Sequence, residues 1–529
     1  MTSELSGFRR FSHGAPPPRR GSIFSNVQRG TDLQRGSVVS IATTAAQTTG
    51  HSWCYILRAM QRQNYSLAPG FGICTCAIII NSHFYYFDIF DKLSDIYDGK
   101  KYYTPIDVLK IAMYFLGACI GSIVCGSYQN TWPARLSNYV IGAILFASCG
   151  FMFWINDIAT CIARLLAGFC YAFTYITLIT QVADNVMKTV RGYMASGLAQ
   201  STALGLILGI GFSEHSWKTL AYMVWMLRII LLAFPITVLL TNRFLTYEPI
   251  TRLLKMEQET EAREVLDELR RGKIESSVIQ YEIEERKLML IEDYVDESEG
   301  CGFRKVFSNG NAMTLLWLVL LRILYVLTAN MYLFILSAIS IYQELNYVMH
   351  MVLMGTRLLI MVIPQYSIDK LGRRGLLLTS GLGSGILLLP FAAQHTTDIR
   401  IRGDLMSLIT FGVHIFSALG IEPVQPIYAS EAFPLSVRNG SIAIVTCVEY
   451  VLQGTIAILL LLGEKLPLQI LLVVTPVCVL LLTIILFVKL PETKSMPLRR
   501  CRNQFNKNIP KKTLPSRVSS IHTLGSTFM

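Results

Sequence analysis

Long apolar stretches separated by short polar ones dominate the chain from about residue 68 onward. A helix needs roughly 17–25 mostly apolar residues to cross a bilayer. Stretches of that length occur at residues 68–89, 106–128, 136–156, 158–180, 192–213, 218–241, 312–341, 346–368, 373–394, 404–428, 439–463 and 467–489. Six of them precede a polar interval and six follow it. The pattern predicts an all-α membrane protein with twelve transmembrane helices in two six-helix halves.

The polar interval between the halves has a different rhythm. In "QETEAREVLDELRRGK" (258–273), apolar residues recur among charged ones at helical spacing, with Leu266 and Leu269 three residues apart. This predicts two or three short amphipathic helices on the cytosolic side. A solvated acidic linker is the alternative.

Both ends of the chain are polar and basic. Basic residues close to membrane spans favour the cytosolic side, so both termini are predicted to be cytosolic, which an even number of spans requires. The predicted segments are a disordered N-terminal tail (1–67), the first half (68–242), the helical linker (243–311), the second half (312–489) and a C-terminal tail (490–529).

Composition agrees with this division. Only 16% of the 529 residues are charged, whereas soluble proteins average about 25%, and the mean hydropathy is +0.45. The formal net charge of +12 lies mostly in the tails, which argues against nucleic-acid binding. The bilayer is therefore the expected surroundings of the chain.

Neither cysteines nor nucleotide motifs indicate a cofactor. Most of the twelve cysteines lie inside apolar runs, and we interpret them as small packing residues and not as disulfides or metal ligands. No G-x-x-x-x-G-K-[ST] pattern is present. We predict a protein that is not an enzyme and holds no cofactor or metal.

Charged motifs recur at the predicted cytosolic turns of both halves. "SIDKLGRRGLLL" (367–378) separates the eighth and ninth spans, and "GSYQNTWPAR" (126–135) occupies the equivalent turn of the first half. "DNVMKTVRG" (184–192) follows the fourth span, and "EAFPLSVRNG" (431–440) follows the tenth. In each member of this second pair, an acid stands seven residues before an arginine.

Equivalent charges in two halves are typical of a transporter with internal repeats. Such charges can form ion pairs that hold one conformation and break in the other. We therefore predict an inner gate. Its residues are Arg135, Asp184, Arg191, Asp369, Arg373, Arg374, Glu431 and Arg438. The alternative is that these arginines only orient the spans.

At these motifs the chain resembles the major facilitator superfamily, and within it the sugar porters, including the insect-type facilitated sugar or trehalose transporters. "DKLGRR" (369–374) is similar to the family's D-R-x-G-R-R turn, "EAFPLSVR" to its E-x-F-P-x-x-x-R motif, and "LPETKS" (490–495) to its P-E-T-K ending. The resemblance implies a monomeric plasma-membrane carrier that moves a small-molecule solute by alternating access around a mid-membrane site.

The sugar-reading positions of that family are mostly lost. Its Q-Q-x-S-G-x-N run in span seven aligns with "LYVLTAN" (324–330), which keeps only Asn330. The span-five glutamine is displaced by one position, to Gln200, and the G-P-x-P-W of span ten becomes "EPVQP" (422–426). Hexose specificity does not follow from the resemblance.

Ionisable residues inside spans each cost roughly 2.5–3.5 kcal/mol and indicate function. Arg322, Arg357, Glu422 and Glu449 lie inside the second-half spans. By resemblance, Arg357 and Glu449 stand where the family's asparagines bind sugar, and Tyr450 stands in place of a tryptophan. The predicted solute-binding residues are Gln200, Asn330, Arg357, Glu449 and Tyr450. The alternative is a buried Arg357–Glu449 pair that only holds helices together.

The first half has no mid-span carboxylate that could carry a proton. Facilitative uniport of a sugar is therefore the favoured prediction. An organic ion transporter, suggested by Arg357 and Glu449, and a non-transporting solute sensor on the same scaffold are the alternatives.

Overall fold

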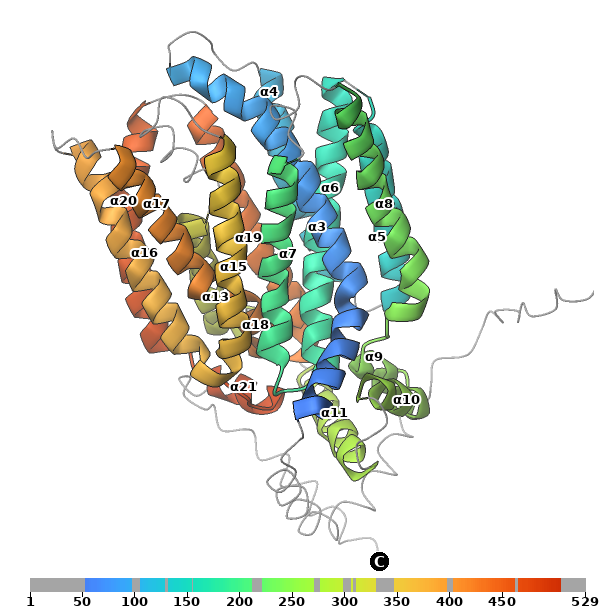
Figure 1. Cartoon of the computed structure of the whole chain (residues 1–529). Coiled ribbons are helices and arrows are strands. Elements are labelled where there is room, and N and C mark those ends of the chain that lie inside the picture. Colours follow the sequence, from blue (N-terminus) through green and yellow to red (C-terminus); the bar gives the residue numbers. More distant parts are fainter. Residues whose placement is uncertain are drawn as a thin grey trace, which may run out of the picture.

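A computed structural model gives the arrangement of the chain, and its helices stand side by side in one bundle (Figure 1). It describes residues 53–97, 105–128, 132–154, 156–211, 221–270, 276–297, 306–307, 311–329, 347–396, 403–461 and 465–505. Every regular element within these ranges is a helix.

The N-terminal half consists of six helices. They are α3 (Trp53–Tyr97), α4 (Pro105–Tyr128), α5 (Ala134–Phe151), α6 (Asp157–Asn185), α7 (Arg191–Gly211) and α8 (Ala221–Leu245). Five further membrane helices of the C-terminal half are continuous α-helices. They are α13 (Asn311–Ala329), α15 (Tyr347–Leu371), α16 (Arg373–Thr396), α19 (Leu435–Leu461) and α20 (Lys465–Lys489).

The remaining span of the C-terminal half is composite. It runs from α17 (Gly403–Phe416) through a π-helical turn, η2 (Ser417–Ile421), into α18 (Glu422–Ala432). With this span, the described residues contain twelve helices long and apolar enough to cross a membrane. The predicted twelve-span, all-α membrane fold is therefore confirmed.

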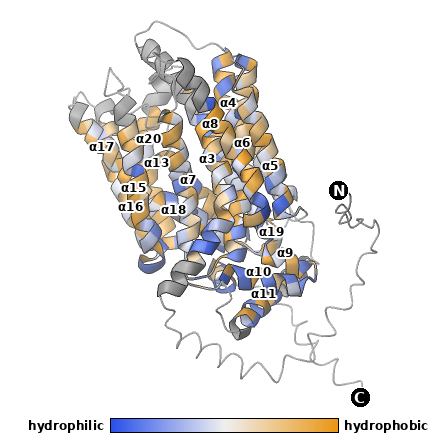
Figure 2. Cartoon of the chain, turned by 45° about the vertical axis from the view of Figure 1, so that its right-hand side comes forward, coloured by the Kyte–Doolittle hydropathy of each residue, from blue (hydrophilic) through white to orange (hydrophobic). Residues whose placement is uncertain are grey.

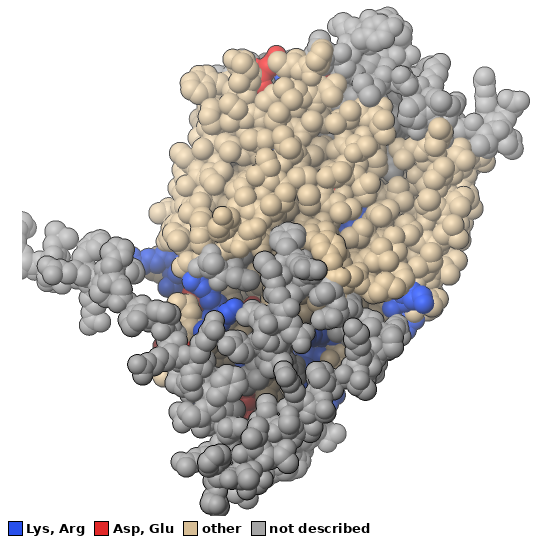
Figure 3. Space-filling model, turned by 180° about the vertical axis from the view of Figure 1, so that it is seen from behind, with Lys and Arg blue, Asp and Glu red and all other residues tan. Residues whose placement is uncertain are grey.

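Hydrophobic side chains cover the bundle, because its outer surface would face lipid. Apolar residues colour most of the helical bundle, and polar ones increase toward the end that carries α9 to α11 (Figure 2). From behind, Lys and Arg side chains gather mainly at this end, below a broad uncharged belt (Figure 3). We call it the linker end.

Backbone contact between α4 and α6 holds the N-terminal half together. A Cβ atom added at Gly117 would lie 2.0 Å from the carbonyl oxygen of Leu165. One added at Gly168 would lie 2.0 Å from the carbonyl oxygen of Tyr114. Small residues of this kind let membrane helices approach closely, where van der Waals packing drives association.

The two halves meet mainly at α4 and α7 of the N-terminal half. In the described part of the chain, α4 packs extensively against α19, and α7 packs against α15 and α18. These contacts bring the connection from α6 to α7 close to the connection from α18 to α19. The charged motifs of the two halves therefore meet at the linker end.

Three helices between the halves lie at the linker end (Figure 1). They are α9 (Ile250–Lys255), α10 (Glu259–Arg270) and α11 (Ser276–Glu297). Ile250, Leu266 and Ile283 belong to a small apolar core of their own. The helical spacing in the sequence therefore corresponds to packed helices.

Two predicted boundaries are wrong. The prediction of a tail up to residue 67 fails for residues 53–67, because α3 begins at Trp53. No glycine or proline interrupts this stretch, and the Arg62 guanidinium anchors it to Glu268 of α10. The remaining residues of the predicted N-terminal tail, 1–52, lie outside the described part of the chain.

The predicted C-terminal tail also contains structure. Residues Leu498–Phe505 form helix α21, whose Cys501 and Phe505 are buried. The Phe505 ring lies edge-on to the ring of Tyr428 in α18, with 6.0 Å between centroids. Aromatic packing thus holds this short polar helix against the bundle. Residues 506–529 lie outside the described part.

Candidate functional site

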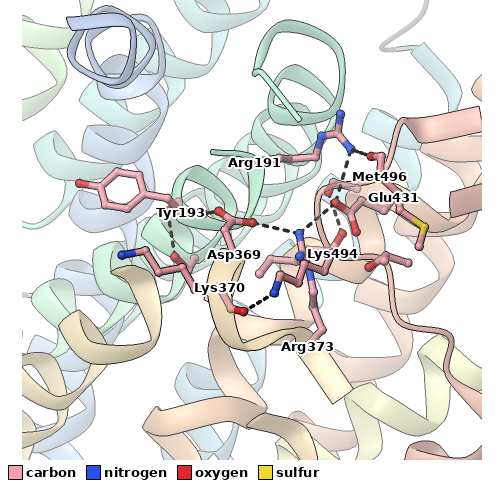
Figure 4. Close-up of polar contacts among 12 residues, drawn as sticks. Arg191, Tyr193, Asp369, Lys370, Arg373, Glu431, Lys494 and Met496 are labelled. Atoms are coloured by element: carbon pink, nitrogen blue, oxygen red, sulfur yellow. Dashed lines mark hydrogen bonds and ion pairs between the residues drawn. The ribbon is translucent and has the colours of Figure 1, made fainter. Parts of the chain in front are cut away.

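Two buried ion pairs join the halves at the linker end. Arg438 Nη1 lies 2.7 Å from Asp184 Oδ1, and Arg191 Nη1 lies 3.4 Å from Glu431 Oε1. The pairing is crossed, since the acid of each half binds the arginine of the other half. Figure 4 shows Arg191 and Glu431 facing each other across this boundary. The repeated seven-residue spacing thus places four complementary charges at one interface.

Arg373 and Asp369 extend this network. Arg373 Nη2 donates to Asp369 Oδ1 at 3.1 Å and to Glu431 Oε1 at 3.4 Å, so Arg191 and Arg373 share the Glu431 carboxylate (Figure 4). Asp369 also accepts a hydrogen bond from the backbone N–H of Tyr193 in α7, at 3.0 Å. Two helices of the C-terminal half are therefore tied to the start of α7.

Arg374 has a different set of contacts. Its guanidinium donates to the carbonyl of Phe487 at 2.6 and 3.1 Å. The Glu492 carboxylate accepts hydrogen bonds from the backbone N–H groups of Arg373 and Arg374 at the start of α16. A carboxylate at this position satisfies free N–H groups and complements the helix dipole.

The N-terminal half repeats this arrangement with Arg135. Glu248 accepts hydrogen bonds from the backbone N–H groups of Ala134 at 2.9 Å and Arg135 at 3.3 Å, at the start of α5. Arg135 Nε donates to the carbonyl of Thr246 at 3.0 Å. Arg135 is thus the structural counterpart of Arg374. The described contacts of both arginines lie within one half, so neither joins the halves as Asp184, Arg191, Asp369, Glu431 and Arg438 do.

The linker helices contact the gate directly. Asp184 Oδ2 accepts a hydrogen bond from Thr251 of α9 at 2.6 Å, and the Asp184 carbonyl accepts one from Arg286 of α11 at 2.6 Å. Burial alone would raise the pKa of Glu282 in α11, but the guanidinium groups of Arg270 and Arg286 lower it below its usual value. The Glu282 carboxylate thus balances the positive charges of Arg270 and Arg286 beside the gate.

Farther into the bundle, the buried charges of the C-terminal half form two ion pairs. Arg357 Nη2 lies 2.6 Å from Glu422 Oε1, and Arg322 Nη1 lies 2.9 Å from Glu449 Oε2. The alternative of an Arg357–Glu449 pair is therefore wrong. Helix rotation within the bundle decides which side chains meet, and a single sequence does not encode it directly. Glu422 follows the π-helical turn, whose Ser417 donates a hydrogen bond to it at 3.2 Å.

Arg322 also bridges the halves. Besides Glu449, it donates to Gln425 Oε1 at 2.6 Å and to the hydroxyl oxygen of Tyr175 in α6. Its guanidinium carbon lies 5.0 Å from the centroid of the Tyr175 ring, a distance at which a cation is attracted to the ring face. Sequence reasoning singled out Arg322 as an intramembrane charge, but no motif indicated Tyr175 or Gln425.

Tyr450 lies among tyrosines of the N-terminal half. Its ring is edge-on to Tyr114 of α4 and Tyr171 of α6, with centroids 6.4 and 6.1 Å apart. Gln200 of α7 donates a hydrogen bond to Gln365 of α15, which is a further contact between the halves. Gln200, Glu449 and Tyr450 therefore lie near the interface of the halves. The printed partner of Arg357, Glu422, belongs to its own half, and Asn330 is outside the described residues.

A second buried arginine of the N-terminal half contacts an amide. Arg164 of α6 donates a hydrogen bond to Asn81 Oδ1 of α3 at 2.9 Å.

Among the described residues, no group of three or more His, Cys, Asp or Glu side chains could hold a metal ion.

A profile of the family described as "Sugar (and other) transporter" matches residues 79–505. The chain belongs to this family. The match covers all the described gate residues and the two interior ion pairs, Arg322–Glu449 and Arg357–Glu422.

Individual relatives of the sugar-transporter family are distant. "Sugar transporter ERD6-like 17" of Arabidopsis thaliana is 24% identical over 63% of this chain and 70% of its own length. "Probable polyol transporter 3" of Arabidopsis thaliana is 24% identical over 67% and 74%. The facilitated glucose transporter member 7 of Mus musculus is 23% identical over 63% and 66%. These relatives are transporters and not enzymes.

Solved structures share the fold. The proton:xylose symporter XylE bound to 6-bromo-6-deoxy-D-glucose has a TM-score of 0.67 at 16% identity, over 84% of this chain and 98% of that one. The human organic anion transporter MFSD10 has a TM-score of 0.54 at 12% identity, over 80% and 99%. The chain thus has the major facilitator fold and is a multi-pass membrane protein of the sugar-porter type.

Proposed function

We propose that this protein carries a neutral polar solute, a sugar or polyol, across the plasma membrane by facilitative uniport. The observation that carries the proposal is the crossed pair of buried ion pairs, Asp184–Arg438 and Arg191–Glu431, at the linker end. These pairs close the boundary between the halves at one end, and a solute could leave there only after they separate. Alternating access by relative motion of the halves provides that separation.

The charge balance of the C-terminal half favours a neutral solute. Arg322 is matched by Glu449, and Arg357 by Glu422, at 2.9 and 2.6 Å. Binding an organic ion would require an excess charge at the site, whereas these four groups sum to zero. Gln200, Arg357, Glu449, Tyr450 and the undescribed Asn330 remain the proposed solute contacts. Glutamine, tyrosine and paired charged groups can all hydrogen-bond hydroxyls.

The contact between Arg164 and Asn81 supplies no group that could carry a proton. A proton-coupled carrier needs a group that gains and loses a proton during the cycle, and an amide such as Asn81 does not titrate. The two carboxylates of the C-terminal interior, Glu422 and Glu449, each lie beside an arginine. Each carboxylate is thus one partner of an ion pair that balances the charge of the interior.

We place the linker end, both termini and the gate in the cytosol. The basic tails and the linker helices favour this orientation, and α9 to α11, α21 and the start of α3 share one end of the bundle (Figure 1). The described conformation is then closed toward the cytosol. A monomer is sufficient, because both halves of the site belong to one chain.

The test is uptake of labelled glucose, trehalose, sorbitol and tetraethylammonium into proteoliposomes that contain the full chain. We expect uptake of at least one neutral solute, at a rate that dissipating the pH gradient leaves unchanged. Uptake of tetraethylammonium alone would overturn the neutral-solute assignment. Loss of uptake without the pH gradient would overturn uniport. A folded protein that moves none of these solutes would support the sensor alternative.

The proposed solute contacts need separate variants. Arg357→Ala and Glu449→Ala should each lower uptake, with the exposed Arg263→Ala in α10 as the matched control. Normal uptake in both interior variants would overturn the site assignment.

A further inference from the structure

Two thiols meet across the boundary between the halves. Cys119 lies on α4 and Cys447 on α19. The Cys119 thiol donates a hydrogen bond to the carbonyl of Cys447, with 3.8 Å between sulfur and oxygen. Both residues are partly exposed, unlike the cysteines of the N-terminal core.

The backbones of α4 and α19 are close on both sides of these thiols. Toward the linker end, a Cβ atom added at Gly126 would lie 2.7 Å from the Cβ atom of Ala443. In the other direction, one added at Gly454 would lie 3.1 Å from the Cβ atom of Phe115. A disulfide requires two Cα atoms about 4.4–6.8 Å apart, and such tight packing brings helix backbones together.

The thiols lie within the membrane span. Cys119 is nine residues before the end of α4 at Tyr128, and Cys447 is twelve residues after the start of α19 at Leu435. At 1.5 Å per residue these positions are about 14 and 18 Å from the linker end. A bond there would join the two bodies that must move relative to each other, if the proposed alternating access holds.

We propose that Cys119 and Cys447 form a peroxide-sensitive site whose disulfide locks the halves in the conformation closed at the linker end. One thiol loses its proton, and its sulfur attacks an oxygen of hydrogen peroxide, which gives a sulfenic acid and one water. The second thiol then attacks that sulfur, which forms the S–S bond and releases a second water. In sum, two thiols are oxidised by two electrons and one peroxide is reduced to two waters.

Hydrogen peroxide suits this location because it is small and uncharged. Partial exposure favours thiol oxidation, and the Cys119 sulfur already lies 3.8 Å from the carbonyl oxygen of Cys447 in the described state. The lock rests on the proposed alternating access, but the formation of the disulfide does not.

A second thiol pair provides an internal control. The sulfur atoms of Cys76 and Cys149 are 3.9 Å apart, and both residues are buried within the N-terminal half. A disulfide at that position would join α3 to α5 and leave the boundary between the halves free. Cys76→Ala is therefore the control variant for Cys119→Ala.

The first experiment detects the bond itself. The full chain in membranes is treated with hydrogen peroxide, free thiols are blocked, and peptides are analysed by mass spectrometry. We expect a peptide linked through Cys119 and Cys447, absent after dithiothreitol and in Cys119→Ala, and retained in Cys76→Ala. Absence of the linked peptide from the oxidised wild-type protein would overturn the proposal.

The second experiment tests the lock without any solute. Hydrogen–deuterium exchange of the gate segment 184–191 should slow by about tenfold or more after oxidation of the wild-type protein, because opening is blocked. Cys119→Ala should show no such change. A linked protein with unchanged exchange would overturn the lock.

Uptake measurements distinguish a failure of the disulfide lock from a failure of the proposed carrier function. Uptake by the wild-type protein should fall by about tenfold or more on oxidation and return with dithiothreitol. Persistent uptake by fully linked protein would overturn the lock. If the reduced protein moves no solute, the carrier proposal fails, while the linked peptide and the exchange result still decide the redox site.

Discussion

Replacing Arg438 by alanine would leave the Asp184 carboxylate in the closed gate without its ion-pair partner. The side chains of Arg438 and Asp184 are only 2% and 3% exposed, so water reaches neither in the described conformation. Opening the linker end would hydrate the Asp184 carboxylate. The variant should therefore favour the open state.

The size of the shift follows from the burial of the pair. Breaking a buried ion pair by removing one partner costs about 3–5 kcal/mol. Asp184 keeps its 2.6 Å hydrogen bond from Thr251, so we take the lower end of this range. About 3 kcal/mol corresponds to a shift of roughly 150-fold in the ratio of closed to open protein.

Distance measurements between two labels can follow this shift without a known solute. Lys188, between α6 and α7, and Lys370, near the end of α15, are exposed and lie on opposite halves. Labels on unnatural amino acids at these sites avoid the native cysteines. We expect Arg438→Ala to move the population to longer label distances.

Two further variants of this protein complete the test. In α10, Arg263 forms an exposed pair with Glu259 at 4.0 Å, so Arg263→Ala should leave the distances unchanged. Asp184→Asn combined with Arg438→Gln removes both charges and should give a smaller shift than Arg438→Ala. Identical distances in Arg438→Ala and Arg263→Ala would refute the gating role of the pair.

Three other perturbations test neighbouring parts of the structure. Arg373→Ala should shift the same label distances about tenfold further toward the open state than Arg374→Ala, because only Arg373 binds carboxylates at the gate; equal shifts would contradict this. Gly372 has a φ of +96°, so Gly372→Ala should lower stability by about 1–3 kcal/mol in thermal unfolding. Gly375→Ala, where an added Cβ meets open space, should not, and similar unfolding temperatures would argue against backbone strain. The lowered pKa of Glu282 means that its stabilising effect is present above about pH 4.3 and is lost as pH falls through the lowered value. Glu282→Gln should remove that acid-dependent loss, and matching pH profiles would disprove it.

The membrane spans could be predicted from the sequence because length and hydropathy are local properties. The gate motifs could also be located, since the acid and arginine spacing of Asp184–Arg191 repeats in Glu431–Arg438. The crossed pairing of these residues depends on how the halves face each other. That arrangement is a tertiary property which the spacing does not specify.

The interior was harder to predict. Arg357 and Glu449 were recognised as intramembrane charges, but their partners are Glu422 and Arg322. Partner choice depends on helix rotation, which has no local sequence signal, and on the π-helical turn before Glu422, next to Pro423, whose missing N–H interrupts the helical hydrogen bonds. The polar helix α21 was missed for another reason, because its stability comes from packing against α18 and not from its own pattern.

The two interior ion pairs also constrain how the protein is made. Arg322 and Arg357 are synthesised before Glu422 and Glu449, yet each arginine alone disfavours membrane insertion by roughly 2.5–3.5 kcal/mol. The early helices of the C-terminal half therefore enter the bilayer with a penalty that only later helices remove. A chain truncated before α19 leaves Arg322 without Glu449, and quality control in the membrane would encounter a cation that lacks its carboxylate partner. The helices that carry Glu422 and Glu449 thus complete the insertion of helices that precede them.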